Sequence, residues 1–177
     1  MSEKLYFAYG SNMNLDQMSF RCPNAEVVGV VRVDDYRLTF CGNGGVCGVA
    51  TILPEPGSHV DGVLWRISVE DEKNLDFYEG YPRLYGKEPV EVIDRRGQRM
   101  TVMAYTMNSP YKECPTPPSQ RYLQSIVDGC RQNDIDPTPI RVEANRLFKK
   151  IKRSASLISP KRNKAERRDA GSKHLER

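Results

Sequence analysis

The sequence predicts an α+β domain, and two observations lead to this fold class. Segments with the β-branched, aromatic or alternating residues typical of strands outnumber helical segments along the 177-residue chain. The few helical segments do not alternate with the strands as they would in a doubly wound parallel sheet. Because the chain is long enough for a core of its own, we expect one domain over residues 1–152 and a basic tail over residues 153–177.

Strands are predicted where β-branched and aromatic residues run together or alternate with polar ones. These segments are 4–9, 27–33, 36–41, 46–53, 60–67, 90–93 and 100–107. Glycine, proline and polar residues predict a break at 42–45, a turn at 54–58 and a hairpin connection at 94–99. The proline-rich stretch 109–118 is expected to be an extended loop.

Helices are predicted over 15–20, 69–79, 119–133 and 141–152. The second has the clearest limits. Ser68 followed by Asp71 is a variant of the capping box, which marks a helix start. Gly80 and Pro82 stop the helix near Glu79.

The net charge of +4 belongs to the end of the chain. From Lys149 onward there are 11 basic and 3 acidic residues, which leaves 16 basic and 20 acidic residues in the preceding part. We expect residues 154–177 to be disordered. Such a tail is either a solvated terminus or an arm that binds nucleic acid or an anionic surface through its charge.

Several functional classes are excluded by what the sequence lacks. It has no apolar run of membrane-spanning length and no apolar secretory stretch at its start, so we expect a cytoplasmic protein. Its five widely spaced cysteines fit neither a disulfide framework nor a zinc site. The two histidines, His59 and His174, lie in a turn and in the tail, which argues against a Ser-His-Asp or Cys-His arrangement. We expect no metal and no cofactor, and chemistry that relies on a carboxylate, backbone donors and tyrosines.

The segment 5–13 predicts a strand that enters a glycine turn and then a helix start. Gly10 permits a tight turn or close approach to a ligand, and Asn14 with Gln17 resembles a capping box. Free backbone N–H groups at such a turn can bind a carboxylate or phosphate. The alternative is an ordinary β-to-α turn.

Glu79 is the candidate acid–base residue. It lies four residues after Leu75, so both point inward if Leu75 packs on the sheet. The negative end of the helix and, more strongly, burial would then raise the pKa of Glu79 toward the range useful in proton transfer. The alternative is a solvated glutamate, and Glu72 shares the same helix face.

Taken together, these segments resemble the γ-glutamylcyclotransferase-like (AIG2-like) family. The resemblance covers residues 4–135 and follows the family's order through 9–12, 48–52, 60–65, 75–80 and 117–122. It implies a small mixed β-barrel with flanking helices and a cavity at one end. It also implies an enzyme that needs no cofactor and releases 5-oxoproline, because the α-amine of a γ-glutamyl substrate attacks the γ-carbonyl.

The resemblance also assigns residues. Glu79 matches the family's general acid/base, whereas Tyr85 and Tyr122 match tyrosines near the substrate or, alternatively, pack in the core with satisfied hydroxyls. The loop that would hold the γ-glutamyl group consists of Tyr9, Gly10, Ser11 and Asn12. A second hypothesis is a module that binds a γ-glutamyl or other carboxylate ligand without turnover. The sequence leaves open which γ-glutamyl compound is the substrate.

Overall fold

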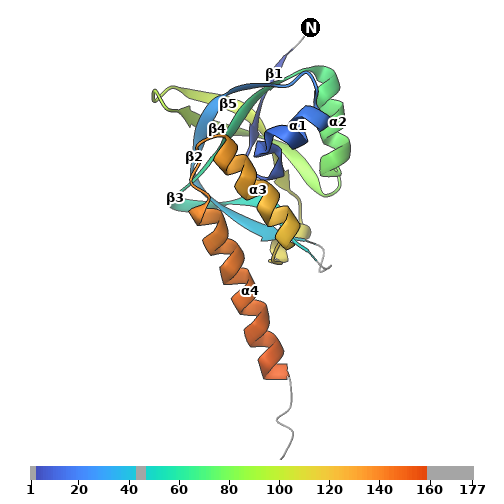
Figure 1. Ribbon diagram of the computed structural model, residues 1–177, viewed down its shortest axis with the longest axis vertical. Coiled ribbons are helices and arrows are strands. Elements are labelled where there is room, and N and C mark those ends of the chain that lie inside the picture. The colour runs from blue at the N-terminus through green and yellow to red at the C-terminus, as the bar shows by residue number, and fades with distance from the viewer. Residues whose placement is uncertain (1–2, 43–46, 159–177) are drawn as a thin grey trace, which may run out of the picture.

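The computed structural model describes residues 3–42 and 47–158, and its strands close into one barrel with the order β1-β3-β2-β4-β5 (Figure 1). The strands are β1 Lys4–Ala8, β2 Glu26–Cys41, β3 Val49–Ile67, β4 Tyr85–Asp94 and β5 Arg99–Met107. Neighbouring strands are antiparallel except for β1 and β5, which run parallel where the barrel closes. The predicted α+β class and the small mixed barrel with flanking helices are confirmed.

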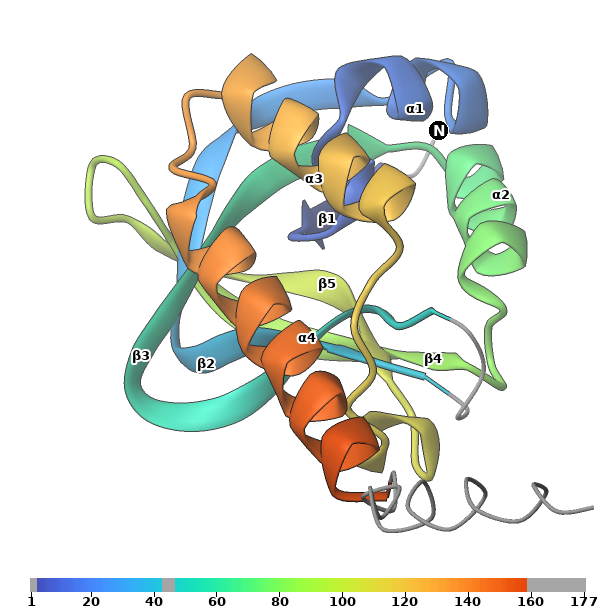
Figure 2. The same ribbon diagram turned by 60° about the horizontal axis from the view of Figure 1, so that its bottom comes forward.

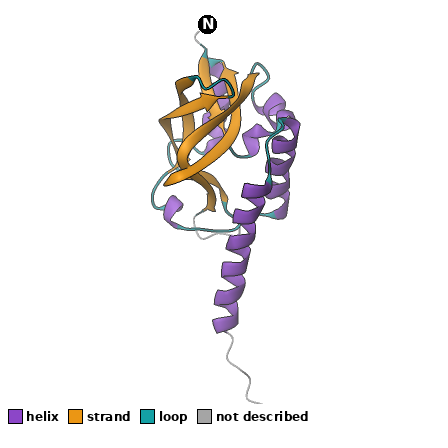
Figure 3. Cartoon of the chain, turned by 90° about the vertical axis from the view of Figure 1, so that its left-hand side faces the viewer, coloured by secondary structure: helices purple, strands orange, loops and turns teal. Residues whose placement is uncertain are grey.

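The helices of the described residues are α1 Leu15–Arg21, α2 Val69–Glu79, α3 Gln120–Gln132 and α4 Thr138–Ile158, with short 3₁₀ segments η1 Ser11–Met13 and η2 Tyr111–Glu113. Helices α1, α2 and α3 surround the end of the barrel where β1 leads into η1 (Figure 2). Helix α4 continues beyond the strands, as Figure 3 shows. None of the described helices combines the length and apolarity needed to cross a membrane.

The predicted turn at 54–58 is wrong. The segments 27–33 and 36–41 are one strand, and β3 likewise continues through the predicted turn. The pairing passes from Asp34–His59 directly to Tyr36–Pro54, so β3 carries the extra residues 55–58 opposite Asp35. Asp35 has a φ of 61°, which takes up the irregularity on β2. Proline and glycine therefore mark a bulged region of a long ribbon, a place where strands accept both residues.

The other differences concern the limits of elements. Strand β4 begins at Tyr85, before the predicted segment 90–93, and β3 begins at Val49. Part of the predicted break at 42–45, together with residue 46, lies outside the described residues. The predicted loop 109–118 contains η2. Helix α4 is longer than predicted at both ends and spans the expected boundary between residues 152 and 153. The prediction of disorder is therefore wrong for residues 154–158, which continue the helix. The remainder of the predicted disordered tail, 159–177, also lies outside the described residues.

Helix α2 begins and ends where the capping residues in the sequence predict. Ser68 Oγ accepts from the Asp71 backbone N–H, and the Asp71 carboxylate accepts from the Ser68 N–H, so both halves of the capping box are present. Gly80 adopts a left-handed conformation with a φ of 63°, which ends the helix directly after Glu79. Leu75 is fully buried in the core, so this face of α2 points inward as predicted.

Candidate active site

All the residues that the sequence singled out for the site line one small pocket. Tyr9, Gly10, Ser11, Asn12, Glu79, Tyr85 and Tyr122 meet there, together with Tyr6, Ala50 and Tyr105. They come from strands β1, β3, β4 and β5, from the loop after β1 with η1, and from helices α2 and α3, so only the folded barrel brings them together. The pocket has a volume of about 30 Å³.

The loop after β1 is fixed on two sides. On one side, Asn14 caps α1 by accepting from the Gln17 N–H at 3.0 Å, as the sequence predicts. On the other, α3 holds the loop because Asn133 Nδ2 donates to the Met13 carbonyl at 2.9 Å. A Cβ on Gly10 would lie 3.3 Å from the Cβ of Ala50 and 3.5 Å from the hydroxyl oxygen of Tyr122. Glycine therefore lets the loop approach β3 and α3 at the wall of the pocket.

Glu79 directs its carboxyl into the pocket from the last turn of α2. The residue keeps some exposure to solvent, yet protein atoms closely surround the carboxyl group. Burial raises the pKa of Glu79, while the charge of Arg21 and a hydrogen bond from Asn12 oppose that increase. The direction agrees with the sequence-based expectation, and burial is the main cause of the shift.

Asn12 forms the centre of the hydrogen-bond network. Its side chain is almost fully buried, and Nδ2 donates both to Glu79 Oε1 at 2.8 Å and to the hydroxyl of Tyr6 at 2.9 Å. Its Oδ1 accepts from Arg21 Nη1 at 2.5 Å. The backbone is also held, because the indole N–H of Trp65 donates to the Asn12 carbonyl at 3.1 Å. The amide is therefore a rigid donor to the carboxyl of Glu79.

The tyrosine hydroxyls bond to the backbone around the pocket. The hydroxyl of Tyr85 donates to the Ala50 carbonyl at 2.5 Å, and that of Tyr122 accepts from the Ala50 N–H at 3.1 Å. Tyr9 donates to the carbonyl of Tyr105. Burial and then the charge of Glu79 raise the pKa of Tyr9, and burial raises the pKa of Tyr122 to about 12. These phenols stay neutral near pH 7, and the hydroxyls of Tyr85 and Tyr122 are satisfied as the core-packing alternative expects.

Tyr6, Tyr105 and Arg21 belong to this network but were not found from the sequence. Tyr6 and Tyr105 lie on β1 and β5, the parallel pair that closes the barrel, and their rings meet edge to face at 5.7 Å. Parallel pairing of strands so far apart in the chain leaves no local signal. Arg21 follows an unremarkable helical segment, and only its contact with Asn12 identifies it.

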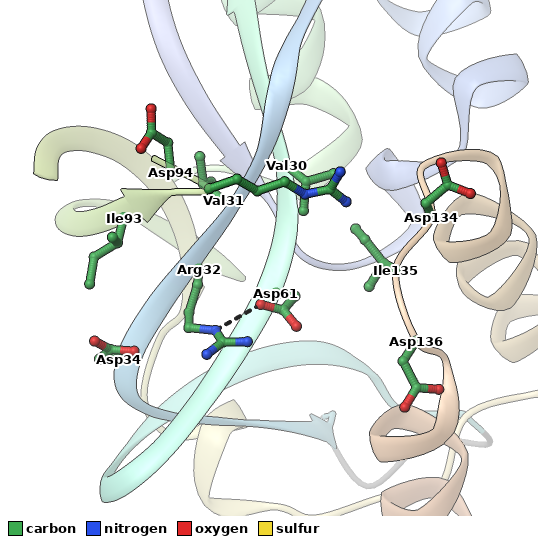
Figure 4. A pocket seen from close by; sticks show the side chains of 11 residues that line it. Val30, Val31, Arg32, Asp34, Asp61, Ile93, Asp94, Asp134, Ile135 and Asp136 are labelled. Atoms are coloured by element: carbon green, nitrogen blue, oxygen red, sulfur yellow. Dashed lines mark hydrogen bonds and ion pairs between the residues drawn. The ribbon is translucent and has the colours of Figure 1, made fainter. Parts of the chain in front are cut away.

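A larger cavity of about 400 Å³ lies elsewhere and contains none of these residues (Figure 4). Ile93 and Asp94 line it at the end of β4, whereas Tyr85, at the start of β4, lines the small pocket. Arg32 and Asp61 form an ion pair at its wall, with 3.0 Å between Nε and Oδ1. The small pocket is the candidate site because of the chemistry of the residues that line it, although the other cavity is larger.

The molecule is a closed mixed barrel in which a carboxyl faces a tyrosine-glycine-serine-asparagine loop. The family described as "Gamma-glutamyl cyclotransferase, AIG2-like" matches residues 6–124. The chain belongs to this family of enzymes, and the resemblance seen in the sequence is confirmed.

Comparisons with individual proteins support the same family. The γ-glutamylcyclotransferase of Homo sapiens is 33% identical over 138 residues, which is 74% of this chain and 72% of the human protein. That of Mus musculus is 34% identical with the same coverage. A solved structure of a protein named "Gamma-glutamyl cyclotransferase" matches with a TM-score of 0.69 and 32% identity, and covers 75% of this chain and 80% of that one.

Proposed function

We propose that this protein releases 5-oxoproline from a γ-glutamyl amine or amino acid, with Glu79 as general acid and base. The observation that supports this proposal best is the Glu79 carboxyl itself. It is buried, hydrogen-bonded by Asn12 and directed into a pocket that the loop 9–12 lines. Membership in the γ-glutamyl cyclotransferase family supplies the reaction class.

The reaction needs no nucleophile from the protein. The α-amine of the substrate attacks its own γ-carbonyl carbon, a C–N bond forms the five-membered ring, and the C–N bond to the leaving amine breaks. The attacking nitrogen changes from an ammonium group to the ring N–H and so loses two protons, and the leaving nitrogen gains two as it departs as an ammonium group. Since both ends of the attack belong to one molecule, the protein contributes orientation and proton transfer.

Glu79 suits both proton steps. The hydrogen bond from Asn12 favours its ionised form, which can accept a proton from the α-ammonium group. Burial has the opposite effect and makes the protonated form more accessible than in a solvated glutamate, so the same group can deliver that proton to the leaving amine. Two such transfers move both protons from the attacking to the leaving nitrogen, and the carboxylate is regenerated.

The loop 9–12 is proposed to hold the γ-glutamyl group. The first N–H groups of a helical turn lack acceptors within the helix, and η1 begins at Ser11 in the pocket wall. Tyr85 and Tyr122 shape the adjoining wall through their bonds to Ala50. A volume of about 30 Å³ holds on the order of one or two waters.

A panel of γ-glutamyl compounds tests this proposal, with 5-oxoproline as the measured product. The panel includes γ-glutamyl amino acids, glutathione and γ-glutamyl-lysine. We expect at least one compound to be turned over and the Glu79→Gln protein to release product only at background. Glu91→Gln is the matched control, because Glu91 is an exposed glutamate whose partner is the exposed Arg99. Stabilisation by these compounds without product would instead support the binding-module hypothesis and refute turnover.

A further inference from the structure

The Asn12 amide can in principle face Glu79 in two ways. Its oxygen and nitrogen ends have nearly the same shape, but one only accepts and the other only donates hydrogen bonds. If the oxygen faced Glu79, an ionised carboxylate would meet another acceptor and the site would favour the protonated acid. The orientation of this one amide therefore decides which form of Glu79 is stabilised.

Arg21 determines that orientation. A guanidinium group only donates, and Nη1 of Arg21 lies 2.5 Å from Asn12 Oδ1. The oxygen end of the amide must therefore face Arg21, which leaves Nδ2 for Glu79 Oε1 and for the hydroxyl of Tyr6. With Arg21 removed, neither end of the amide is tied to a particular neighbour on that side.

Arg21 is itself anchored to the helix that carries Glu79. Its guanidinium lies over the ring of Tyr78, 4.7 Å from the centroid, and Tyr78 precedes Glu79 on α2. Asn74, also on α2, donates from Nδ2 to the backbone carbonyl of Arg21 at 3.2 Å. Arg21 does not line the pocket, so it acts through Asn12 and not by touching substrate.

We propose that Arg21 is a positioning residue for the reaction, because it fixes the Asn12 amide as a donor and so keeps Glu79 ready to accept a proton. This inference rests on the proposed function for its role in turnover. Its effect on Glu79 does not depend on turnover and can be measured in the protein without substrate.

The charges around Glu79 support the same role. Among the charged and titratable side chains of the described residues that act electrostatically on Glu79, Arg21 is the cation. The remaining ones are buried phenols from β1, β4, β5, α3 and the loop after β1, namely Tyr6, Tyr9, Tyr85, Tyr105 and Tyr122. Burial raises the pKa of Glu79, and the positive charge of Arg21 opposes it. Removal of that charge therefore shifts the pKa of Glu79 further upward.

An NMR titration of the glutamate carboxyl carbons tests the inference directly, with Glu79→Gln to assign the signal of Glu79. We expect Arg21→Gln to move the Glu79 midpoint to higher pH, and Arg21→Lys, which keeps the charge without the planar fork, to move it less. Arg99→Gln removes the same charge from an exposed pair with Glu91 and should leave the midpoint in place. Unchanged midpoints in both Arg21 variants would overturn the inference.

The pH profile of kcat/KM supplies the second readout. Because Glu79 must begin as a carboxylate, Arg21→Gln should lower kcat/KM about tenfold on the acidic side, the scale of losing one facing charge, and less on the alkaline side. Arg21→Lys should recover part of the loss. An equal loss at every pH without recovery would show a merely structural role and refute the inference. If the unaltered protein turns over no γ-glutamyl compound, the proposed function fails, whereas the NMR titration still decides the role of Arg21.

Discussion

Helix α2 carries two inward-facing glutamates, and their surroundings give them opposite properties. Glu72 and Glu79 lie about two turns apart on the same face. Glu72 accepts from Lys4 Nζ at 2.5 Å and from Lys87 Nζ at 2.7 Å. Glu79 instead has an amide and phenols around it, with Arg21 acting from behind Asn12. Burial raises the pKa of both, but for Glu72 the two lysines outweigh burial and lower the pKa.

The comparison shows that the face of a helix does not determine the role of a carboxylate on it. Glu72 lies in the first turn, where the helix dipole favours a negative charge, and two cations neutralise it. Glu79 lies in the last turn, where the dipole disfavours the charge, and burial is only partly offset. The first arrangement stabilises the fold, whereas the second costs stability and is the kind of environment that the proposed proton transfer needs.

The largest expected effect comes from Glu79→Gln. Loss of a general acid/base lowers the rate by roughly two orders of magnitude or more, so 5-oxoproline release should fall by at least that factor. The thermal midpoint at neutral pH should stay equal or rise, because the variant no longer buries an ionised carboxylate. Turnover assays and thermal unfolding of the same preparation measure both quantities. A variant with full activity would remove Glu79 from the mechanism.

Glu72→Gln should lower stability and leave activity largely intact, which is the reverse of the effect expected for Glu79→Gln. Loss of the charge leaves Lys87, only 21% exposed, without part of its compensation, and we expect a loss of about 1–3 kcal/mol in the free energy of unfolding. The variant should keep most of its activity per folded molecule. Urea unfolding measures the loss, and Glu91→Gln is again the exposed control, with an expected change below about 1 kcal/mol. A stability equal to that of the control would contradict the conclusion that Glu72 is the glutamate that stabilises the fold.

The pH dependence of stability separates the two glutamates by sign. The lowered pKa of Glu72 contributes stability above the ordinary glutamate pKa, and this contribution is lost as the pH falls through the lowered value. The gap between the unaltered protein and Glu72→Gln should therefore close on acidification. For Glu79 the penalty develops as the pH rises through its raised pKa, so the advantage of Glu79→Gln should disappear at acidic pH. Thermal midpoints measured across an acid-to-neutral pH series test both trends, and gaps independent of pH would refute them.

Local signals predicted the end of α2 and the loop after β1 because capping residues and glycines act within one turn. Ser68, Asp71 and Gly80 place Glu79, while Asn14 and Gln17 place the start of α1. The partners of each glutamate were not predictable in this way. Lys4 lies on β1 and Lys87 on β4, so both reach Glu72 only because the barrel brings these strands to one side of α2.

The wrong turn prediction and the missed pocket residues have the same cause, which is pairing between strands that are distant in the sequence. Residues 54–58 carry a strong turn signal, yet the pairing of β2 with β3 on both sides overrides it. Tyr6 and Tyr105 reach the pocket through closure of the barrel, which a sequence read segment by segment does not reveal. The residues of the candidate site were therefore predictable where a turn or helix end fixes them, and not where a distant strand supplies them.

The smallest loss of stability should come from variants of the lysines that pair with Glu72. It tests how much each lysine contributes to holding that carboxylate. Lys4 is 47% exposed and Lys87 is 21% exposed, and Lys87 also pairs with Asp76 at 2.7 Å. Lys4→Met should cost below about 1 kcal/mol and lose its effect at high salt, as exposed pairs do. Lys87→Met should cost more and depend less on salt, because its pairs are better shielded from solvent. Urea unfolding at low and high salt measures both variants. If Lys4→Met cost as much as Lys87→Met, the more exposed contact would be an equal partner in holding Glu72, and solvent screening would not rank the two pairs.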